Sequence, residues 1–384
     1  MNNQPAIERR DNALDVARGI TIILVVIGHM IASVQAFADL HNSVYAFHIP
    51  FFFFASGLVF NEVKYSRFPA LLKRKAKTLI IPYLLFSFLS WLWYVAERIY
   101  YAGGFFSENA AQYKEQFFEI FQAHYSAKMA YNPPLWFVLS LFAVELIHFL
   151  LKKIKWIPLY WGAVTACVVL GWWLESEYCP IDTSLWPWNI CSALYSVGFY
   201  ALGNSAKPLY AKVIVQNERL RLSTRVMLTV AGGLLIAGAC WLGIRNGFVS
   251  IGSRVLKNGY LLYLTGLMGT AGILIISKTL SSLCACRYLR FCGRNSFYFM
   301  AVHWVARDAV EFAYNLFSRI TGRGNLFFGR TSAKRCLVMM VVVMVMSTVF
   351  ILLYNYVKRK ILSRNVATEQ PKTAGAAEGP EVAG

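Results

Sequence analysis

Residues 15–29 read DVARGITIILVVIGH, an apolar stretch with Arg18 near one end and His29 at the other. With its flanks the stretch is long enough to cross the hydrocarbon core of a bilayer as a helix of ~20 residues. Eleven positions separate Arg18 from His29. On a helix these side chains lie within about 20° of each other around the axis and ~16 Å apart along it. The stretch therefore predicts a transmembrane helix with one polar face.

The rest of the chain has the same apolar character. It has 384 residues, of which 57% are hydrophobic and only 15% are charged. A soluble domain carries about 25% charged residues. The mean hydropathy of +0.48 extends over the whole length, which excludes a water-soluble enzyme, a disordered chain and a single-span receptor.

Apolar runs of spanning length recur, so we expect an all-α polytopic membrane helix bundle with about ten transmembrane helices. The runs are at residues 18–37, 44–62, 78–100, 133–151, 156–174, 190–206, 226–244, 258–277, 295–313 and 336–357. Most Lys and Arg residues fall in connections on the side of the N-terminus, and cytoplasmic loops collect these residues. We therefore predict a multi-pass protein of the cell's inner (cytoplasmic) membrane with both termini cytoplasmic.

This topology divides the chain into three parts. We expect a cytoplasmic N-terminal segment at 1–17, a transmembrane domain at 18–360 and a disordered cytoplasmic tail at 361–384, which is rich in Ala, Gly, Glu and Pro. The net charge of +19 would suggest nucleic acid in a soluble protein. Here it is explained by cytoplasmic loops, so we expect membrane lipids and no nucleic acid as partners.

The eight cysteines are too sparse for a disulfide scaffold. They form no CxxC pair, and no histidine lies near the group at 284–292, so we expect no metal site. Cys179 and Cys191 flank one predicted outer loop, and their spacing leaves a bridge between them open.

Titratable groups inside a bilayer are costly and mark candidate sites. Arg18 is predicted at the cytoplasmic mouth and His29 near the midplane. Asp15 precedes Arg18 by three residues, close enough on a helix to pair with it. The alternative without function is an Arg18 that extends to the interface and a buried, hydrogen-bonded His29.

Other polar residues fall near this helix. His48 lies near the outer end of the second predicted span, where it either approaches His29 or caps the helix start. His303 falls near midplane depth in the ninth. The run KRKAK at 73–77, with Arg74 and Lys77, fits either anchoring by positive charge or a docking patch for a polyphosphate. Glu145 and His148 lie three residues apart, which is compatible with a structural pair.

Four segments resemble the acyltransferase-3 family of integral membrane acyltransferases, in order over roughly residues 10–360. They read LDVARGITIILVVIGHM, FHIPFFFFASGLVF, NPPLWFVLSLF and GRNSFYFMAVH. Arg18 and His29 match the family signature of Arg, ten residues, then His. The family's R-x-x-R motif is only approximated, because Arg74 matches but Lys77 stands at the second position. Lysine keeps the charge and loses the two-pronged geometry of arginine.

The resemblance implies transfer of an acetyl or similar acyl group from acyl-CoA to a hydroxyl of a glycan or lipid-linked sugar. The motifs are most similar to single-domain sugar O-acetylases of the fucose 4-O-acetylase type. Acetyl-CoA would then be a donor substrate, with no tightly bound cofactor. His29 would be catalytic, as a general base or as a nucleophile. Binding roles fall to the donor-side residues Arg18, Asp15, Arg74 and Lys77 and to His48 and His303, which would orient the acceptor or polarise the thioester carbonyl.

A second function class fits part of the same pattern. A polytopic transporter or flippase of a lipid-linked sugar or organic ion would also use buried histidines and an Arg–Asp pair. Against it, the sequence shows no paired helix breaks in two halves.

Overall fold

The computed structural model describes residues 11–61, 65, 67–101, 103, 109–176, 178–215, 221–281, 283–322 and 333–368. Within these ranges every named element is helical, which confirms the predicted all-α class. The described backbone also contains an isolated antiparallel bridge between Ser250 and Val255.

In the described part of the chain, ten α-helices have more than eleven residues and five are shorter. The long ones are α1 (Asn12–Ile31), α5 (Ile81–Tyr101), α6 (Ala110–Gln122), α7 (Trp136–Leu151), α8 (Ile157–Leu174), α9 (Ile190–Ser205), α11 (Leu222–Asn246), α12 (Gly259–Leu280), α14 (Ser296–Thr321) and α15 (Ala333–Thr368). The shorter ones are α2 (Ala38–Tyr45), α3 (His48–Leu58), α4 (Phe68–Lys75), α10 (Lys207–Tyr210) and α13 (Arg287–Arg294).

Single turns of other geometry join them. The 3₁₀ turns are η1 (Gln35–Phe37), η4 (Ser126–Lys128), η5 (Pro133–Leu135), η6 (Pro187–Asn189) and η8 (Cys284–Cys286). Two turns are π-helical, η2 (Ala76–Ile80) and η7 (Ala211–Val215). The turn η2 joins α4 to α5 without a break, so these elements form one continuous helix.

Seven helices of the described chain are long and apolar enough to cross a membrane. They are α1, the continuous helix Phe68–Tyr101, η5 with α7, α8, α11, α12 and α15. Three predicted spans fall short of this standard. Helix α3 has 11 residues, ~16 Å against a core of ~30 Å, α9 has 16 residues, and α14 carries Arg307, Asp308 and Glu311. The count of ten and the orientation of the termini stay predictions.

The helix boundaries also differ from those expected at the chain ends. Helix α1 begins at Asn12, before the predicted boundary at residue 18, because Asp11 caps it by accepting hydrogen bonds from the amides of Ala13 (2.9 Å) and Leu14 (3.1 Å). Helix α15 continues to Thr368, past the predicted boundary at residue 361. The rest of the predicted tail, 369–384, lies outside the described residues.

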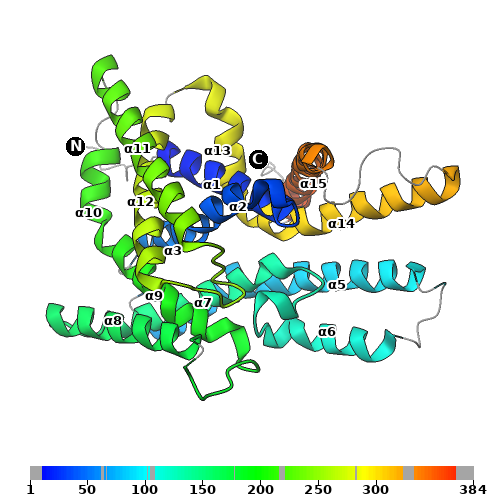
Figure 1. Ribbon diagram of the computed structural model, residues 1–384, viewed down its shortest axis with the longest axis horizontal. Helices are drawn as coiled ribbons and strands as arrows, with labels where there is room; N and C mark the ends of the chain where they lie inside the picture. Colours follow the sequence, from blue (N-terminus) through cyan, green and yellow to red (C-terminus); the bar gives the residue numbers. More distant parts are fainter. Residues whose placement is uncertain are drawn as a thin grey trace, which may run out of the picture.

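Helix α1 is the centre of the fold. It packs against α13, α12, α14, α3 and α15, and Figure 1 shows it between the α11–α12 pair and α14. The α5–α6 pair and α14 extend to one side of the molecule, and α8 extends to the other. Elements distant in sequence therefore converge on the helix that carries Arg18 and His29.

Glycines bring α1 and α13 into backbone contact. A methyl group at Gly19 would clash with the carbonyl of Leu289, and one at Gly293 would clash with the carbonyl of Asp15. Only glycine permits such an approach on both helices. The position of α1 is thus tied to α13.

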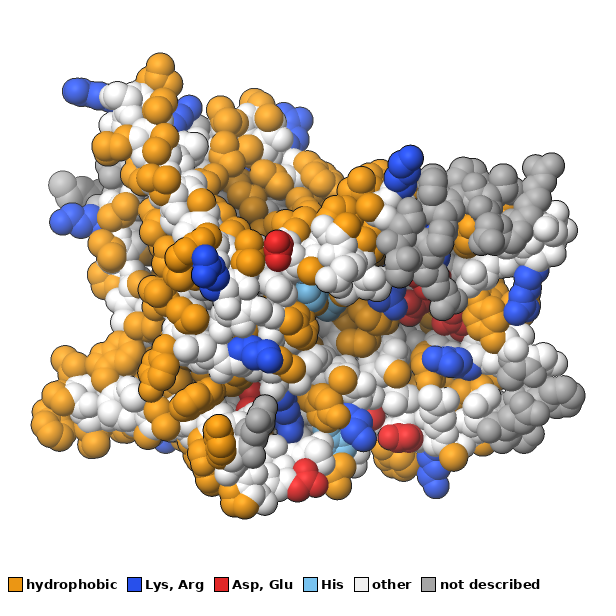
Figure 2. All heavy atoms as spheres, in the orientation of Figure 1, with side chains coloured by type: hydrophobic (Ala, Val, Ile, Leu, Met, Phe, Trp, Pro, Cys, Tyr) orange, Lys and Arg blue, Asp and Glu red, His pale blue; other side chains and the backbone are white. Residues whose placement is uncertain are grey.

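Large apolar side chains cover much of the outer surface. Figure 2 shows hydrophobic side chains spread over the visible face and gathered most densely on its left side, and α8, α11 and α15 expose residues such as Ile157, Leu234 and Leu353. Apolar patches of this extent are unusual on soluble monomers. They are the surface expected of helices in contact with lipid.

Candidate functional site

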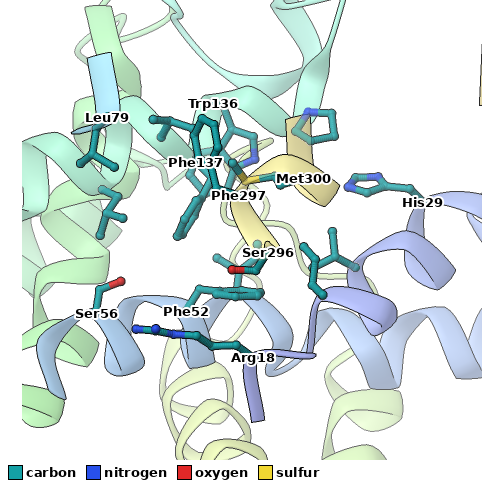
Figure 3. Close-up of a pocket in the computed structure, with 16 residues that line it drawn as sticks. Arg18, His29, Phe52, Ser56, Leu79, Trp136, Phe137, Ser296, Phe297 and Met300 are labelled. Carbon is teal, nitrogen blue, oxygen red and sulfur yellow. The ribbon is translucent and has the colours of Figure 1, made fainter. Parts of the chain in front are cut away.

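Arg18 and His29 line one cavity, as their spacing on α1 predicts. Ile22 and Val25 lie between them on the same helix face, and the cavity has a volume of about 180 Å³. Figure 3 shows the two polar side chains reaching it from different turns of α1, with the Arg18 side chain extended toward Ser56. We call this space the Arg18 cavity. Ser296, Phe297 and Met300 of α14, Phe52 and Ser56 of α3, and Trp136 and Phe137 of α7 complete its wall.

His29 also lines a second cavity, of about 200 Å³. Tyr45, His48 and Trp304 border this space, together with residues of two loops that include Ser126 and Ser253. We call it the Trp304 cavity. Ile49, Pro134 and Trp136 line both cavities with His29. His29 therefore stands where the two spaces meet.

Aromatic and imidazole rings surround His29. Its ring centroid is 5.3 Å from that of His303 and 5.6 Å from that of Trp304. The Tyr45 hydroxyl is 3.3 Å from its Nδ1. The Cζ of Arg307 lies 3.5 Å from the centroid of the Trp304 ring. Its Nη2 forms an ion pair with Oδ1 of Asp308 at 2.7 Å. The Arg307 charge is thereby compensated next to the histidine pair.

Hydrogen bonds to carbonyls fix the tautomers of the other two site histidines. The Nδ1 of His303 lies 2.8 Å from the Phe299 carbonyl, and that of His48 lies 2.7 Å from the Val44 carbonyl. A carbonyl only accepts, so each Nδ1 carries the proton and each neutral ring keeps a lone pair on Nε2. The buried Nε2 of His303 has no hydrogen-bond partner in the described structure. Both rings are thus acceptors toward a ligand.

Asp15 has a partner that the sequence did not indicate. Its Oδ2 lies 2.8 Å from Nε of Arg294, and the carboxylate is 5% exposed. Arg294 ends α13, so this ion pair joins the two helices that meet at Gly19 and Gly293. Asp15 positions the helix end that carries Arg18.

The basic run before α5 lies beside the Arg18 cavity. Arg74 and Lys77 are exposed on α4 and η2, and neither lines the cavity, although Leu79 of the same turn does. Lys75 instead reaches buried Glu145 on α7 at 2.6 Å. A buried carboxylate such as that of Glu145 needs a cationic partner to compensate the cost of its desolvation.

Glu145 is therefore paired with Lys75, and His148 is paired separately. The His148 Nε2 lies 3.3 Å from the Tyr160 hydroxyl. Cys179 and Cys191 are free thiols in the structure, so the bridge left open by their spacing is not formed. No three His, Cys, Asp or Glu side chains converge as metal ligands among the described residues.

Sequence reasoning missed the aromatic and hydroxyl residues of the site. Tyr45 precedes His48 by three residues, and Trp304 directly follows His303. Aromatic residues at such positions usually serve in packing, so their type alone did not mark them as site residues. Trp136 borders both cavities, whereas a tryptophan at the start of a span is by type alone typical of the membrane interface. Ser126 and Ser253, whose hydroxyls are 2.8 Å apart, belong to loops 127 positions apart that no local pattern brings together.

Comparison with known families adds an independent finding. Residues 11–357, nearly the whole chain, match the acyltransferase domain of the acyltransferase-3 type. No curated protein and no solved structure matches the chain. The matched segment contains Arg18, His29 and every other residue of the two cavities. The chain therefore belongs to the acyltransferase-3 family, whose members are membrane acyltransferases.

Proposed function

We propose that the protein is an O-acyltransferase of the inner membrane that moves an acetyl or similar acyl group from acyl-CoA to a hydroxyl of a glycan or lipid-linked sugar. One observation carries the proposal: His29 lies at the junction of two cavities with different linings. A transfer enzyme needs such an arrangement, because donor and acceptor must reach one catalytic group from separate sides.

The Arg18 cavity suits the donor. A guanidinium binds phosphate through paired, charge-assisted hydrogen bonds, and the remaining lining is mostly apolar, as a pantetheine arm requires. In this arrangement Arg18 holds a phosphate or the donor arm, with Asp15 and Arg294 supporting its helix end. Arg74 and Lys77 add charge outside the cavity, and the thioester extends toward His29.

The Trp304 cavity suits a sugar. Tyr45, Trp136, Phe248 and Trp304 supply ring faces, which pack against the apolar face of a pyranose. Ser126 and Ser253 supply hydroxyls at the same cavity. A few polar groups in an aromatic lining are typical of a specific small-molecule site.

The proposed reaction uses His29 as a base. In the tautomer with the proton on Nδ1, this nitrogen donates to the Tyr45 oxygen, and the Nε2 lone pair is available. The sugar oxygen attacks the thioester carbon while its proton passes to Nε2. The C–S bond then breaks, and the imidazolium returns the proton to the CoA thiolate. A route through an acyl-imidazole uses the same lone pair as nucleophile.

The neutral His48 and His303 rings accept hydrogen bonds through Nε2, so they can orient an acceptor hydroxyl. In this tautomer neither can donate to the thioester carbonyl. Of the two roles expected from the sequence, the hydrogen bonds therefore favour positioning of the acceptor.

The test is acyl transfer by the purified protein from labelled acetyl-CoA to a glycan acceptor, read as CoA release and as an alkali-labile ester on the sugar. We expect His29→Gln to lower the rate by ~10²-fold or more, the usual contribution of a general base. His124→Gln is the matched control, because His124 is a buried histidine paired with Glu119 and lines neither cavity.

Equal activity of His29→Gln and His124→Gln would refute the catalytic role of His29. CoA release without ester formation in the wild type would refute the glycan acceptor, and movement of a sugar without any ester would favour the transporter.

A further inference from the structure

A third cavity lies between α13 and α15 and is lined by arginines. It measures about 590 Å³ and is bordered by Arg287, Arg290, Arg294 and Arg359, together with Phe291, Asn295, Leu352, Asn355 and Tyr356. None of these residues lines the Arg18 cavity or the Trp304 cavity. The basic cavity is therefore distinct from the proposed acyl-transfer site.

The sequence of α13 places three of its arginines on one helix face. Arg287, Arg290 and Arg294 are spaced by three and four residues, and such residues share a face of a helix. Gly293, on the adjacent side of the helix, packs against α1. All three arginines border the cavity that residues of α15 also line.

The arginines differ in how far the protein already satisfies them. Arg294 pairs with Asp15, and Arg290 donates to the carbonyls of Ser281 and Leu283. Neither Arg287 nor Arg359 has a hydrogen bond or ion pair within the described part of the chain. Asp15 is the one carboxylate that contacts this group among the described residues. The cavity therefore keeps excess positive charge.

The α15 side of the cavity marks the edge of an apolar surface. Leu352 and Tyr356 are 53% and 63% exposed, and they continue the exposed apolar face of a helix long enough to span a membrane. The next turn reads Lys358-Arg359-Lys360. A spanning helix changes from apolar to basic residues at the depth of lipid headgroups. The cavity lies at this depth by the sequence of α15 itself.

We propose that the basic cavity binds the phosphate headgroup of an anionic membrane lipid, with the acyl chains lying along the apolar face of α15. Guanidinium groups bind phosphate with two parallel hydrogen bonds, and basic pockets beside transmembrane helices are a recognised setting for anionic headgroups. A soluble phosphate would use the same arginines, but it would gain nothing from the exposed apolar surface beside them.

The experiment measures lipid binding to the delipidated full-length protein in detergent by native mass spectrometry. The added lipids are phosphatidylglycerol and phosphatidylcholine, and inorganic phosphate and CoA are tested in separate arms. We expect retention of phosphatidylglycerol over phosphatidylcholine. The variant Arg287→Gln/Arg359→Gln should weaken this binding by about tenfold or more, since each hydrogen bond to a charged group contributes ~1.5–3 kcal/mol.

The matched control is Arg221→Gln/Lys358→Gln, which removes the same charge from exposed positions that do not line the cavity. It should bind phosphatidylglycerol like the wild type. Arg359→Gln alone, at an exposed position, serves if the double variant does not accumulate, and it should show a smaller loss in the same direction.

Equal phosphatidylglycerol binding by the arginine variants and the control would overturn the proposal. So would equal retention of both lipids, or occupation by phosphate or CoA with no retained lipid. Because the experiment measures lipid binding and not activity, its result tests this proposal independently of the proposed acyl transfer.

Discussion

At His29 one hydrogen bond holds the orientation of the imidazole ring. The Tyr45 hydroxyl is the hydrogen-bond partner of Nδ1 at 3.3 Å. We expect Tyr45→Phe to lower turnover about fivefold, the effect of losing one hydrogen bond of ~1 kcal/mol. The KM for acyl-CoA should stay the same. Steady-state kinetics check this, and an unchanged turnover would show that Tyr45 does not position the imidazole.

At Arg18 the issue is charge against geometry. We expect Arg18→Ala to raise the KM for acyl-CoA at least tenfold, since a charge-assisted contact contributes ~1.5–3 kcal/mol. The KM of Arg18→Lys for acyl-CoA should lie between those of the wild type and Arg18→Ala, because lysine keeps the charge and loses the planar guanidinium. The KM for the glycan should not change. A rise in the glycan KM instead would place Arg18 on the acceptor side.

The placement of single residues was predictable where spacing alone decides it. Arg18 and His29 share a cavity because their separation on a helix puts them on one face. The partner of Asp15 was not predictable, because Arg294 lies 279 positions away. Tertiary packing brings α13 against α1, and the period of a single helix carries no information about such a distant partner.

At the scale of elements, the α1–α13 crossing yields a stability prediction. Gly293→Ala places a methyl group against the Asp15 carbonyl, so the helices must separate. We expect a loss of ~1–3 kcal/mol, as for overpacking in a core, and a lower melting temperature in detergent.

The control for this prediction is Gly233→Ala on α11, where an added methyl group meets no atom within 4 Å. It should leave the melting temperature unchanged or raise it, because alanine favours a helix over glycine by about 1 kcal/mol. Similar melting temperatures for both variants would show that the crossing tolerates a wider spacing.

Helices were predictable as elements more reliably than as membrane spans. Each of the ten apolar runs contains a helix, because hydrophobic length indicates a helix in a bilayer. The run at 44–62 contains the end of α2 and the short α3, since the chain turns at Ala46 and Phe47 between them. Helix α9 is largely buried among other helices, and α14 carries charged residues in its middle. Hydropathy along the chain does not measure how far a helix is buried by its neighbours.

At the scale of the whole molecule, the buried carboxyl group of Glu175 predicts an effect of pH on stability. Glu175 lies just beyond the end of α8 and accepts a hydrogen bond from Ser192 at 2.9 Å. Burial raises the pKa of Glu175 to about 8, from an ordinary value of 4.5. Between these values the folded protein keeps a proton that the unfolded chain loses. Stability should therefore fall as the pH rises through this window.

Melting temperatures between pH 5 and pH 8 measure the effect. Glu175→Gln cannot ionise, so its melting temperature should decline less over this range. Exposed Glu115→Gln should decline like the wild type. Parallel curves for all three proteins would assign the pH dependence to other groups.

The crossing at Gly19 and Gly293 also determines how the Arg18 cavity can change shape. Helix α1 is locked to α13 backbone against backbone, and Asn355 joins α15 to Asn295 at 3.1 Å. The α1 side of the Arg18 cavity is therefore held by direct backbone contact. We expect the cavity to change shape at the side where the π-turn η2 carries Leu79. We therefore expect a bulky thioester to displace η2 rather than α1, the helix that holds His29.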